Sequence, residues 1–335
     1  MTRNSQQPTI YDVAARAEVS IGTVSKTLNS PAKVAARTRR RVLDAVRDLD
    51  FVPKEVAATR ARRGARRIGV FAPFSAYASF AERLNGVLTT LPARRVEVAV
   101  FDVQSAAESS HVLESLPALR SLDGVIVMSS PIGPEVAAAL RQGKLPAVLV
   151  DAAGFGLPSV TTDDESGGRL AAEVLVGRGR RRFAFLGHSQ VQPDWASPSR
   201  RRLQGFAAAL AAAGFDLAAD GAVLVGRAFD EAVAAASALL SSGDRPDAVF
   251  AHSDELAAAV HLAARRLGLA VPEDLAIVGF DDSTIAQALD LTTIRQPLRQ
   301  TGEWALRTLT AMIEDPAAAA PSVVLPVQLV RRGSA

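Results

Sequence analysis

Short apolar runs alternate with Ala- and Leu-rich stretches along most of this chain, and that alternation limits its fold more than any other feature. One series of apolar runs contains RIGVFAP, VEVAVFD, DGVIVMSS and PAVLVD. A second series contains RFAFLG, DAVFAH and DLAIVGFDD, with VVLPVQLV near the end. Strands that alternate with helices form parallel sheets covered on both faces. The two series therefore predict an α/β protein with two lobes, each built on a doubly wound parallel sheet.

A chain of 335 residues is too long for one ordinary core and suits two or three domains. We expect a head over residues 1–50, a basic hinge over 51–67 and a bilobed body over 68–335. The expected lobes are about 68–160 with 295–320, and about 161–294 with 321–335.

The positive charge of the chain is concentrated at its N-terminal end. Residues 1–67 hold 15 Lys and Arg against 6 Asp and Glu, whereas residues 68–335 hold 23 against 29. This asymmetry is typical of a small head that binds a polyanion, carried on a mildly acidic body. A solvated charged face would give the same count, so charge alone leaves both interpretations open.

Composition excludes several classes of protein. The chain has no cysteine, which excludes disulfide frameworks, thiolate zinc sites and cysteine nucleophiles. The N-terminus MTRNSQQPT has no apolar core of a signal peptide, and no stretch of about 18 uncharged apolar residues follows. We therefore expect a cytoplasmic protein.

The head reads as three short helices. Thr9 with Asp12 predicts a capped helix start, and apolar residues then recur at helical spacing. Ser20 can cap a second helix, whose inner face carries Val24 and Leu28. A third helix follows the basic run that starts at Arg37, and its apolar positions are Val42, Ala45, Val46 and Leu49.

Three short helices with a tight turn between the first two form a helix-turn-helix, whose second helix can lie in the major groove of DNA. Near the start of that helix Ile21 can meet a thymine methyl, Lys26 can donate to guanine, and Gly22 lies between them. Other polar residues more plausibly hold phosphates or face outward: Tyr11, Ser20, Thr23, Ser25 and Asn29.

In open α/β sheets ligands bind beyond the carboxyl ends of the strands. The polar residues that follow predicted strands are Asp151, Ser253, Asp254 and Asp281, with Asp163 and Asp164 near the crossover between lobes. Arg202 could reach inward from the start of a helix. Each has an ordinary alternative. An Asp at a strand end often caps a helix, and Arg202 lies among three consecutive arginines that could simply be solvated.

The segment IYDVAARAEVSIGTVSKTLN closely resembles the N-terminal signature of the lactose and galactose repressor (LacI/GalR) family. The likeness continues through VTTDDESGGRLAAEVLVGRGRRRFAFLG, RRLQGFAAAL, HSDELAAAV, VPEDLAIVGFDDS and LTTIRQPLRQTGEWAL. The resemblance implies a homodimeric transcriptional repressor with a body like periplasmic sugar-binding proteins. It also implies a pseudopalindromic double-stranded DNA operator and a small-molecule effector, a sugar or a related metabolite. The second-helix positions that read DNA in the family are occupied here by Ile21, Gly22 and Lys26.

The resemblance also implies effector contacts. Arg202, in the RxxGF motif, and Asp281, in GFDD, are the leading candidates, and Phe229 is a candidate stacking ring. Ser79 and Phe80 lie in the stretch that faces the ligand in the first lobe. Asp151 and Ser253 complete the set, and Ser253 stands where the family usually has Asn.

The hinge carries five arginines within residues 60–67. In the resembling family this segment lies in the minor groove and wedges a leucine between base pairs. The positions of this chain that the resemblance places in contact with DNA are Ala57 and Arg60. Arg60 aligns with that leucine. A guanidinium prefers a narrow, electronegative minor groove to an intercalated site, so we expect the arginines to supply salt-sensitive affinity in place of part of the wedge.

Two alternatives remain to be weighed. A transport-type solute-binding protein would use the same bilobed body, but it should carry a secretory signal and lack a basic head. An enzyme has little support: GHSQV has Val191 where the nucleophile-elbow pattern needs glycine. The four histidines lack metal-ligand spacing and the chain has no phosphate loop, so we expect no enzyme, metal or cofactor.

Overall fold

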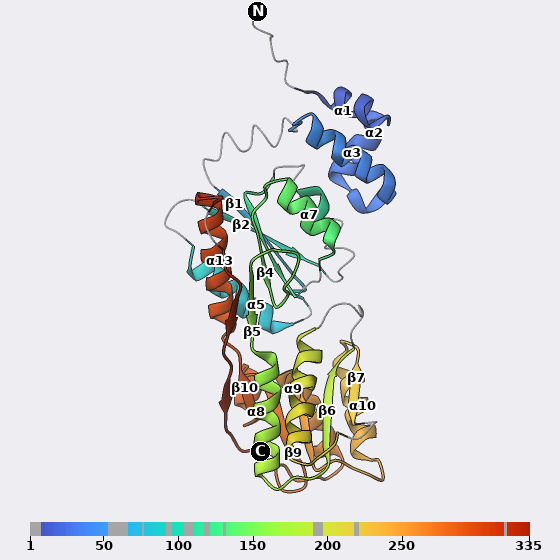
Figure 1. The fold of residues 1–335 in the computed structure, drawn as a ribbon. Coiled ribbons are helices and arrows are strands. Elements are labelled where there is room, and N and C mark those ends of the chain that lie inside the picture. Colours follow the sequence, from blue (N-terminus) through green and yellow to red (C-terminus); the bar gives the residue numbers. More distant parts are fainter. Residues whose placement is uncertain are drawn as a thin grey trace, which may run out of the picture. The chain divides into compact units, whose positions relative to one another are not determined.

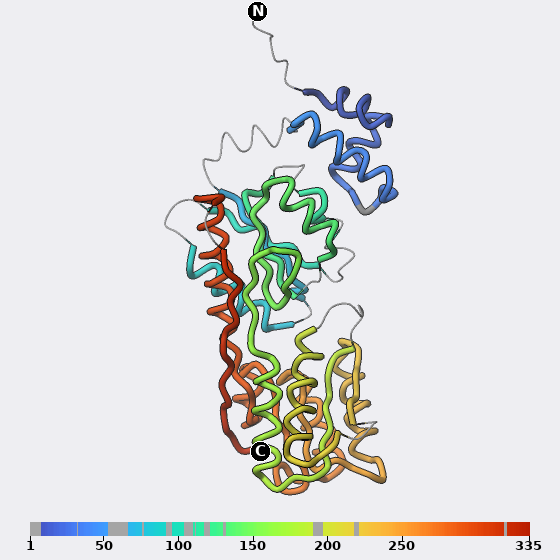
Figure 2. Tube along the Cα trace, viewed as in Figure 1, coloured from blue at the N-terminus to red at the C-terminus, as the bar shows by residue number. Residues whose placement is uncertain are grey.

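The computed structural model describes residues 8–52, 66–75, 77–91, 96–103, 110, 112–116, 121–129, 132–189, 197–217, 221–317 and 320–335. The chain divides into two compact units, of which unit 1 is Met1–Val160 with Gly302–Ser322 and unit 2 is Thr161–Thr301 with Val323–Ala335. Figure 2 lets the chain be followed from one unit to the other. The chain passes from unit 1 to unit 2 after Val160, returns to unit 1 at Gly302 and leaves it again after Ser322.

The head contains three helices, as the sequence predicts, drawn in blue in Figure 1. The third begins at Ala36, however, so the basic run lies within this helix and not before it. The three helices are α1 (Ile10–Ala17), α2 (Ile21–Asn29) and α3 (Ala36–Asp48), and a short 3₁₀ turn, η1 (Pro31–Lys33), connects the last two. Their apolar faces enclose a small core that includes Val13, Val24, Val42, Val46 and Phe51.

Unit 1 is built on a six-stranded sheet of order β11-β5-β4-β3-β1-β2. The strands are β1 (Arg66–Ala72), β2 (Val96–Asp102), β3 (Gly124–Met128), β4 (Ala147–Val150), β5 (Ser159–Thr162) and β11 (Val323–Leu325). From β2 to β5 each neighbouring pair is parallel. The accompanying helices are α5 (Ala78–Thr89), α7 (Pro134–Gln142) and α13 (Leu298–Glu314).

Unit 2 has a second six-stranded sheet, of order β12-β10-β9-β8-β6-β7. Its strands are β6 (Phe183–His188), β7 (Ala222–Val225), β8 (Ala248–Ala251), β9 (Ala276–Asp281), β10 (Thr292–Arg295) and β12 (Gln328–Val330). Its helices are α8 (Asp164–Gly177), α9 (Pro198–Ala212), α10 (Phe229–Leu240), α11 (Asp254–Arg266) and α12 (Thr284–Ala288). One core lies between the sheet and α8 with α9, and another between the sheet and α10 with α11. The predicted pair of α/β sheets is therefore confirmed.

The apolar run VVLPVQLV does not form one continuous strand. It forms two short strands, one in each sheet, separated at Pro326 and Val327. Proline has no N–H to donate to a ladder, which explains the break. The second piece, β12, runs antiparallel to β10, so the second sheet is not wholly parallel.

Helices α8 and α9 lie side by side in unit 2 (Figure 1) and cross where each carries a glycine. A Cβ on Gly168 would lie 2.1 Å from the carbonyl oxygen of Arg202, and one on Gly205 would lie 2.0 Å from that of Glu165. Only glycine permits this approach, and it fixes the position of Arg202 against the start of α8.

Candidate functional site

The start and end of α1 hold the head in the predicted turn. The Thr9 amide and hydroxyl both donate to Oδ2 of Asp12 at 2.7 Å, and the Asp12 amide donates back to the hydroxyl. The side-chain hydrogen bond from Thr9 and then the backbone one hold the pKa of Asp12 below its usual value. Helix α1 ends at Ala17, and the next residue, Glu18, has a φ of 51° that reverses the chain toward α2. The predicted cap and turn are both confirmed.

The second helix presents an uncovered polar face on a buried support. Val24 and Thr27 are buried, whereas Ile21 is 40% exposed. Ser20 caps the helix by accepting from the Thr23 amide at 3.2 Å. The other candidate contacts, Gly22, Lys26 and Asn29, are exposed, Tyr11 of α1 is 68% exposed, and Thr23 and Ser25 are half-buried. The residues of the head that the sequence assigns to DNA therefore lie on α2 or at its cap, apart from Tyr11 of the neighbouring helix.

The basic run of α3 makes contacts within the head and with the rest of unit 1. Arg41 donates to the carbonyls of Ala17 and Glu18 at the end of α1, at 3.1 and 2.9 Å. Arg39 is 5% exposed; it donates to two carbonyls near η1 and pairs with Glu114 at 3.1 Å. These two arginines serve the fold, a role that charge counting does not reveal.

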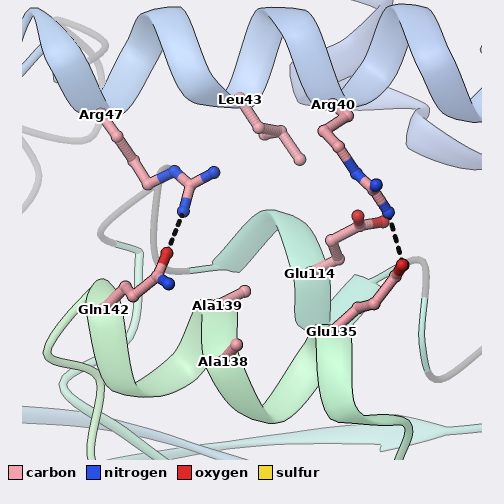
Figure 3. Close-up of a pocket in the computed structure, with 8 residues that line it drawn as sticks. All are labelled: Arg40, Leu43, Arg47, Glu114, Glu135, Ala138, Ala139 and Gln142. Carbon is pink, nitrogen blue, oxygen red and sulfur yellow. Dashed lines mark hydrogen bonds and ion pairs between the residues drawn. The ribbon is translucent and has the colours of Figure 1, made fainter.

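Two further arginines of α3 have partners in unit 1 outside the head. Figure 3 shows Arg40 paired with Glu135, and Arg47 donating to the side-chain oxygen of Gln142, on either side of Leu43. The hinge candidates Ala57 and Arg60 lie outside the described residues.

In unit 1 the predicted effector residues gather around an arginine that the sequence reasoning missed. Arg83 of α5 pairs with Asp151 at 2.6 Å, and the two side chains are 3% and 4% exposed. Its guanidinium carbon lies 5.5 Å from the centre of the Phe80 ring, and its Nη1 reaches the Ser79 carbonyl at 3.5 Å. Asp151 also accepts from the Ser129 hydroxyl at 3.2 Å.

This cluster places Phe80 and Asp151 in the interior of unit 1, while Ser79 stays half-buried. A buried carboxylate needs a nearby cation, because a lone charge is costly away from water. Arg83 lies four residues after Ser79 and therefore on the same face of the helix. That spacing was the available signal for it.

In unit 2 the centre of the candidate site is Arg202, which is 3% exposed rather than solvated as the alternative interpretation held. Its Nε donates to Oδ1 of Asp164 at 2.8 Å, and its Nη1 donates to the carbonyl of His252 at 2.6 Å. Its guanidinium carbon lies 3.5 Å from the centre of the Phe280 ring. Arg201 donates to the other oxygen of Asp164 at 2.7 Å.

The remaining predicted residues of unit 2 lie at strand ends or helix starts. Asp281 ends β9 with a φ of 117°, beside Phe280, and accepts from the side-chain amide of Gln296. Ser253 follows β8, caps α11 through its hydroxyl and is 8% exposed. Phe229 begins α10 and is 39% exposed. Arg202 and Ser253 thus meet around His252, which the sequence reasoning did not assign.

Two histidines complete this edge of the second sheet. His188 ends β6, and His252 directly follows the neighbouring strand β8; their ring centres lie 5.3 Å apart. Burial lowers the pKa of His252 well below its usual 6.5, and the nearby Arg202 and then His188 lower it further. Burial likewise lowers the pKa of His188. Both rings are therefore neutral near pH 7.

The buried neutral His252 predicts a loss of stability in acid. Its pKa is lower in the folded chain than in the unfolded chain, so its stabilising contribution is complete above about pH 6.5 and is lost as the pH falls below that value. Within this range, each fall of one pH unit lowers the free energy of unfolding by about 1.4 kcal/mol for one such group. We expect His252→Gln to flatten the fall in melting temperature between about pH 6.5 and 5.5. His261→Gln is the comparison: burial also lowers the pKa of His261, but less than that of His252, so this variant should flatten the fall less. An unchanged slope in His252→Gln would contradict the assignment.

The described residues contain no group of three or more His, Asp or Glu side chains that could hold a metal ion. Within the same residues, no helix is both long enough and apolar enough to cross a membrane.

Comparisons with known proteins cover the head and the body. A sequence model described as bacterial regulatory proteins, lacI family, matches residues 9–54, and one for a periplasmic binding protein-like domain matches residues 172–335. The transcriptional repressor PurR of Photobacterium profundum is 31% identical over 316 residues, which are 92% of this chain and 92% of that protein. Catabolite control protein A of Priestia megaterium is 29% identical over 332 residues, which are 97% and 98% of the two chains.

Two solved structures match over nearly the full length. The transcriptional regulator CelR in complex with cellobiose has a TM-score of 0.70 and 28% identity, and the match covers 98% of this chain and 100% of that chain. The lac repressor dimer bound to operator and an anti-inducer has a TM-score of 0.70 and 26% identity, with 98% and 99% covered. Because the family model covers the head and the relatives extend over both units, the chain belongs to the LacI family of bacterial regulatory proteins.

Proposed function

We propose that this protein is a homodimeric transcriptional repressor whose binding to operator DNA is modulated by a small molecule held by its body. The observation that carries the proposal is the outer face of α2. Ile21, Gly22 and Lys26 are exposed there, above a buried support of Val24, in the part of the chain that matches the DNA-binding family model.

The chemistry of this face suits the major groove. A helix of this size fits the groove, Lys26 is a point charge that can donate to guanine oxygen and nitrogen acceptors, and Ile21 offers an apolar contact to a thymine methyl. Gly22 offers no side chain, so one base position should be read loosely. A two-fold symmetric dimer presents two such helices, and the operator should therefore be pseudopalindromic.

For the effector we propose the polar edge of unit 2. Arg202 is held by Asp164, Asp281 presents a carboxylate beside Phe280, and Ser253 and Phe229 lie at the starts of the neighbouring helices α11 and α10. Fixed donors and acceptors of this kind can orient a sugar, and CelR is a relative that holds one. Ser79, Phe80 and Asp151 are the proposed contributors from unit 1.

Replacing Lys26 by alanine is expected to weaken binding to a selected operator by about 10- to 100-fold, the range of one lost base contact. The preferred duplex is first enriched from a random-sequence library with the wild-type protein. Affinity is then measured by fluorescence anisotropy on that duplex and on a duplex with one changed base pair at a time. The variant should lose discrimination at one symmetric position and keep it elsewhere.

Lys33→Ala is the matched control, since it removes the same charge from the exposed turn η1. It should weaken binding to all duplexes equally. Asp281→Ala, in unit 2, should leave operator affinity unchanged. An equal loss for Lys26→Ala on selected and random DNA would show that α2 does not read bases.

A further inference from the structure

We propose that the outer face of α7, together with Glu114, is a docking surface for the head of the same chain. Helix α3 of the head lies on this surface, while the α2 residues proposed to read bases stay exposed. The docking itself does not depend on the proposed function, and only the role given to α2 rests on it.

The side of α3 that faces α7 differs from the side that builds the head. Val42, Ala45 and Val46 belong to the head core. Figure 3 shows a second set of side chains directed toward α7, three and four residues apart along α3: Arg40, Leu43 and Arg47. Residues at that spacing share one side of a helix. Leu43 serves both sides, because it also packs in the head core and is only 3% exposed.

Helix α7 is two-sided in the same way. Val136, Ala137 and Leu140 are buried in the core of unit 1. The residues that face α3 are small in the middle and polar at the ends, namely Glu135, Ala138, Ala139 and Gln142. Leu43 therefore faces two alanines, with a polar contact on either side of it (Figure 3). An apolar centre with a polar rim is the usual construction of a protein interface.

The charges at one end of the contact are complementary. Arg40 pairs with Glu135, and Arg39 pairs with Glu114 at 3.1 Å. Both arginines belong to the head, and both carboxylates belong to the rest of unit 1. The side chains of Arg39 and Glu114 are 6% and 18% exposed, so this pair is the better shielded of the two.

The other end of the contact is polar without net attraction. Nη1 of Arg47 donates to Oε1 of Gln142 at 3.0 Å, and Arg47 also pairs with Asp44 of its own helix. Arg141 and Lys144, on either side of Gln142 in the sequence, add positive charge to this end of α7. Electrostatic attraction between the head and the docking surface therefore comes from Glu114 and Glu135.

The contact has the properties of a reversible one. A cavity of about 130 Å³ remains between the two helices, whereas protein cores contain few voids larger than a water molecule. The side chains of Arg40 and Glu135 are 55% and 68% exposed, and salt screens such pairs. Small, polar contacts between parts of one chain usually allow relative motion. The head should therefore dock and release rather than stay fixed.

Docking through α3 leaves the second helix of the head open. With α3 on the docking surface, Ile21 is 40% exposed, and Gly22 and Lys26 are exposed as well. An inhibitory contact would cover these residues. The docking surface instead holds the head while α2 stays accessible to DNA.

Cross-linking between engineered cysteines tests the docking in the full chain without DNA. The chain has no cysteine, so Arg47→Cys with Gln142→Cys introduces the only two thiols. A short bis-maleimide should join them within one chain, and a denaturing gel separates this product from a cross-linked dimer. The comparison pair is Arg47→Cys with Ala311→Cys, whose second thiol lies on an exposed position of α13 in the same unit.

We expect the pair at residues 47 and 142 to react at least about tenfold faster than the comparison pair, because docking raises the local concentration of one thiol near the other. Equal rates for the two pairs would mean that the head moves freely, and cross-linked dimers alone would place it on a second copy. Either result overturns the proposal.

Charge reversal tests the acidic end in the same cysteine background. Glu135→Arg places two arginines opposite each other and should slow the cross-linking about three- to tenfold. Adding Arg40→Glu restores an opposite pair and should restore the rate. Glu82→Arg makes the same charge change on an exposed residue of α5 and should leave the rate unchanged. An unchanged rate in Glu135→Arg, or no recovery in the double reversal, would contradict the docking surface.

Operator binding by the cross-linked protein tests whether docking leaves α2 open. Joined at residues 47 and 142, the protein should bind the selected operator within about threefold of the same variant before cross-linking. Loss of operator binding on cross-linking overturns the docked geometry. If the wild-type protein enriches no palindromic duplex from random DNA, the proposed function fails instead, and the cross-linking rates, which need no DNA, still decide the docking.

Discussion

Gly168→Ala is expected to lose about 3 kcal/mol of folding free energy, because the new methyl group meets backbone rather than a side chain that can turn away. The added Cβ would lie 2.1 Å from the carbonyl oxygen of Arg202 and 2.7 Å from the amide nitrogen of Phe206. Helices α8 and α9 would have to move apart, and Arg202 would leave its position against Asp164. Urea denaturation followed by circular dichroism measures the change.

Gly177→Ala is the matched control, since it adds the same methyl group at the end of the same helix. A Cβ there has no atom within 4 Å. Alanine favours a helix over glycine by up to about 1 kcal/mol, so this variant should be unchanged or slightly more stable. Equal stability of the two variants would mean that the helices do not cross as closely as the structure has them.

Asp164→Leu is expected to lose about 3–5 kcal/mol of folding free energy, the usual cost of removing one partner of a buried ion pair. The side chains of Asp164 and Arg202 are 4% exposed or less, so in this variant Arg202 would stay buried and charged without its carboxylate partner. The double variant Asp164→Leu with Arg202→Met should recover most of the loss, because it leaves no buried charge. The free energies of unfolding of the single and the double variant are both measured by urea denaturation.

Glu173→Ala serves as the control for Asp164→Leu, because it breaks an ion pair of the same helix that lies in solvent. The side chains of Arg169 and Glu173 are 50% and 54% exposed. Such pairs contribute about 0.3–0.5 kcal/mol, so this change should be hardly measurable. If the double variant were as unstable as Asp164→Leu alone, the loss would have to come from packing rather than from an uncompensated charge.

The fold was largely predictable because its signals are local. Runs such as RFAFLG and DAVFAH are short, apolar and bounded by turns, and they form β6 and β8. The cap at Thr9 and the inward-facing Val24 and Val42 also follow from spacing within one helix. The division of VVLPVQLV between two sheets was not predictable, since it depends on which edge each half meets.

The candidate sites were predictable only in part, because a charged residue has the same appearance in the sequence whether it contacts a ligand or another residue. Arg202 and Asp281 could be selected from their motifs. The partner of Arg202, Asp164, lies 38 positions away, and its pairing depends on the contact of α8 with α9. Arg39 and Arg41 belong to the basic run, yet their partners include backbone carbonyls of the head itself.

In the head, the residues proposed to contact DNA are separate from those that keep it folded. Val24 and Thr27 of α2 are fully buried, and Ser20 caps the helix, while Ile21, Gly22 and Lys26 are exposed. Substitutions on an exposed helix surface usually alter stability by less than about 0.5 kcal/mol. The three positions proposed to read bases can therefore change by mutation while the scaffold stays intact, so that paralogues with different targets can diverge from one such head without passing through unfolded intermediates.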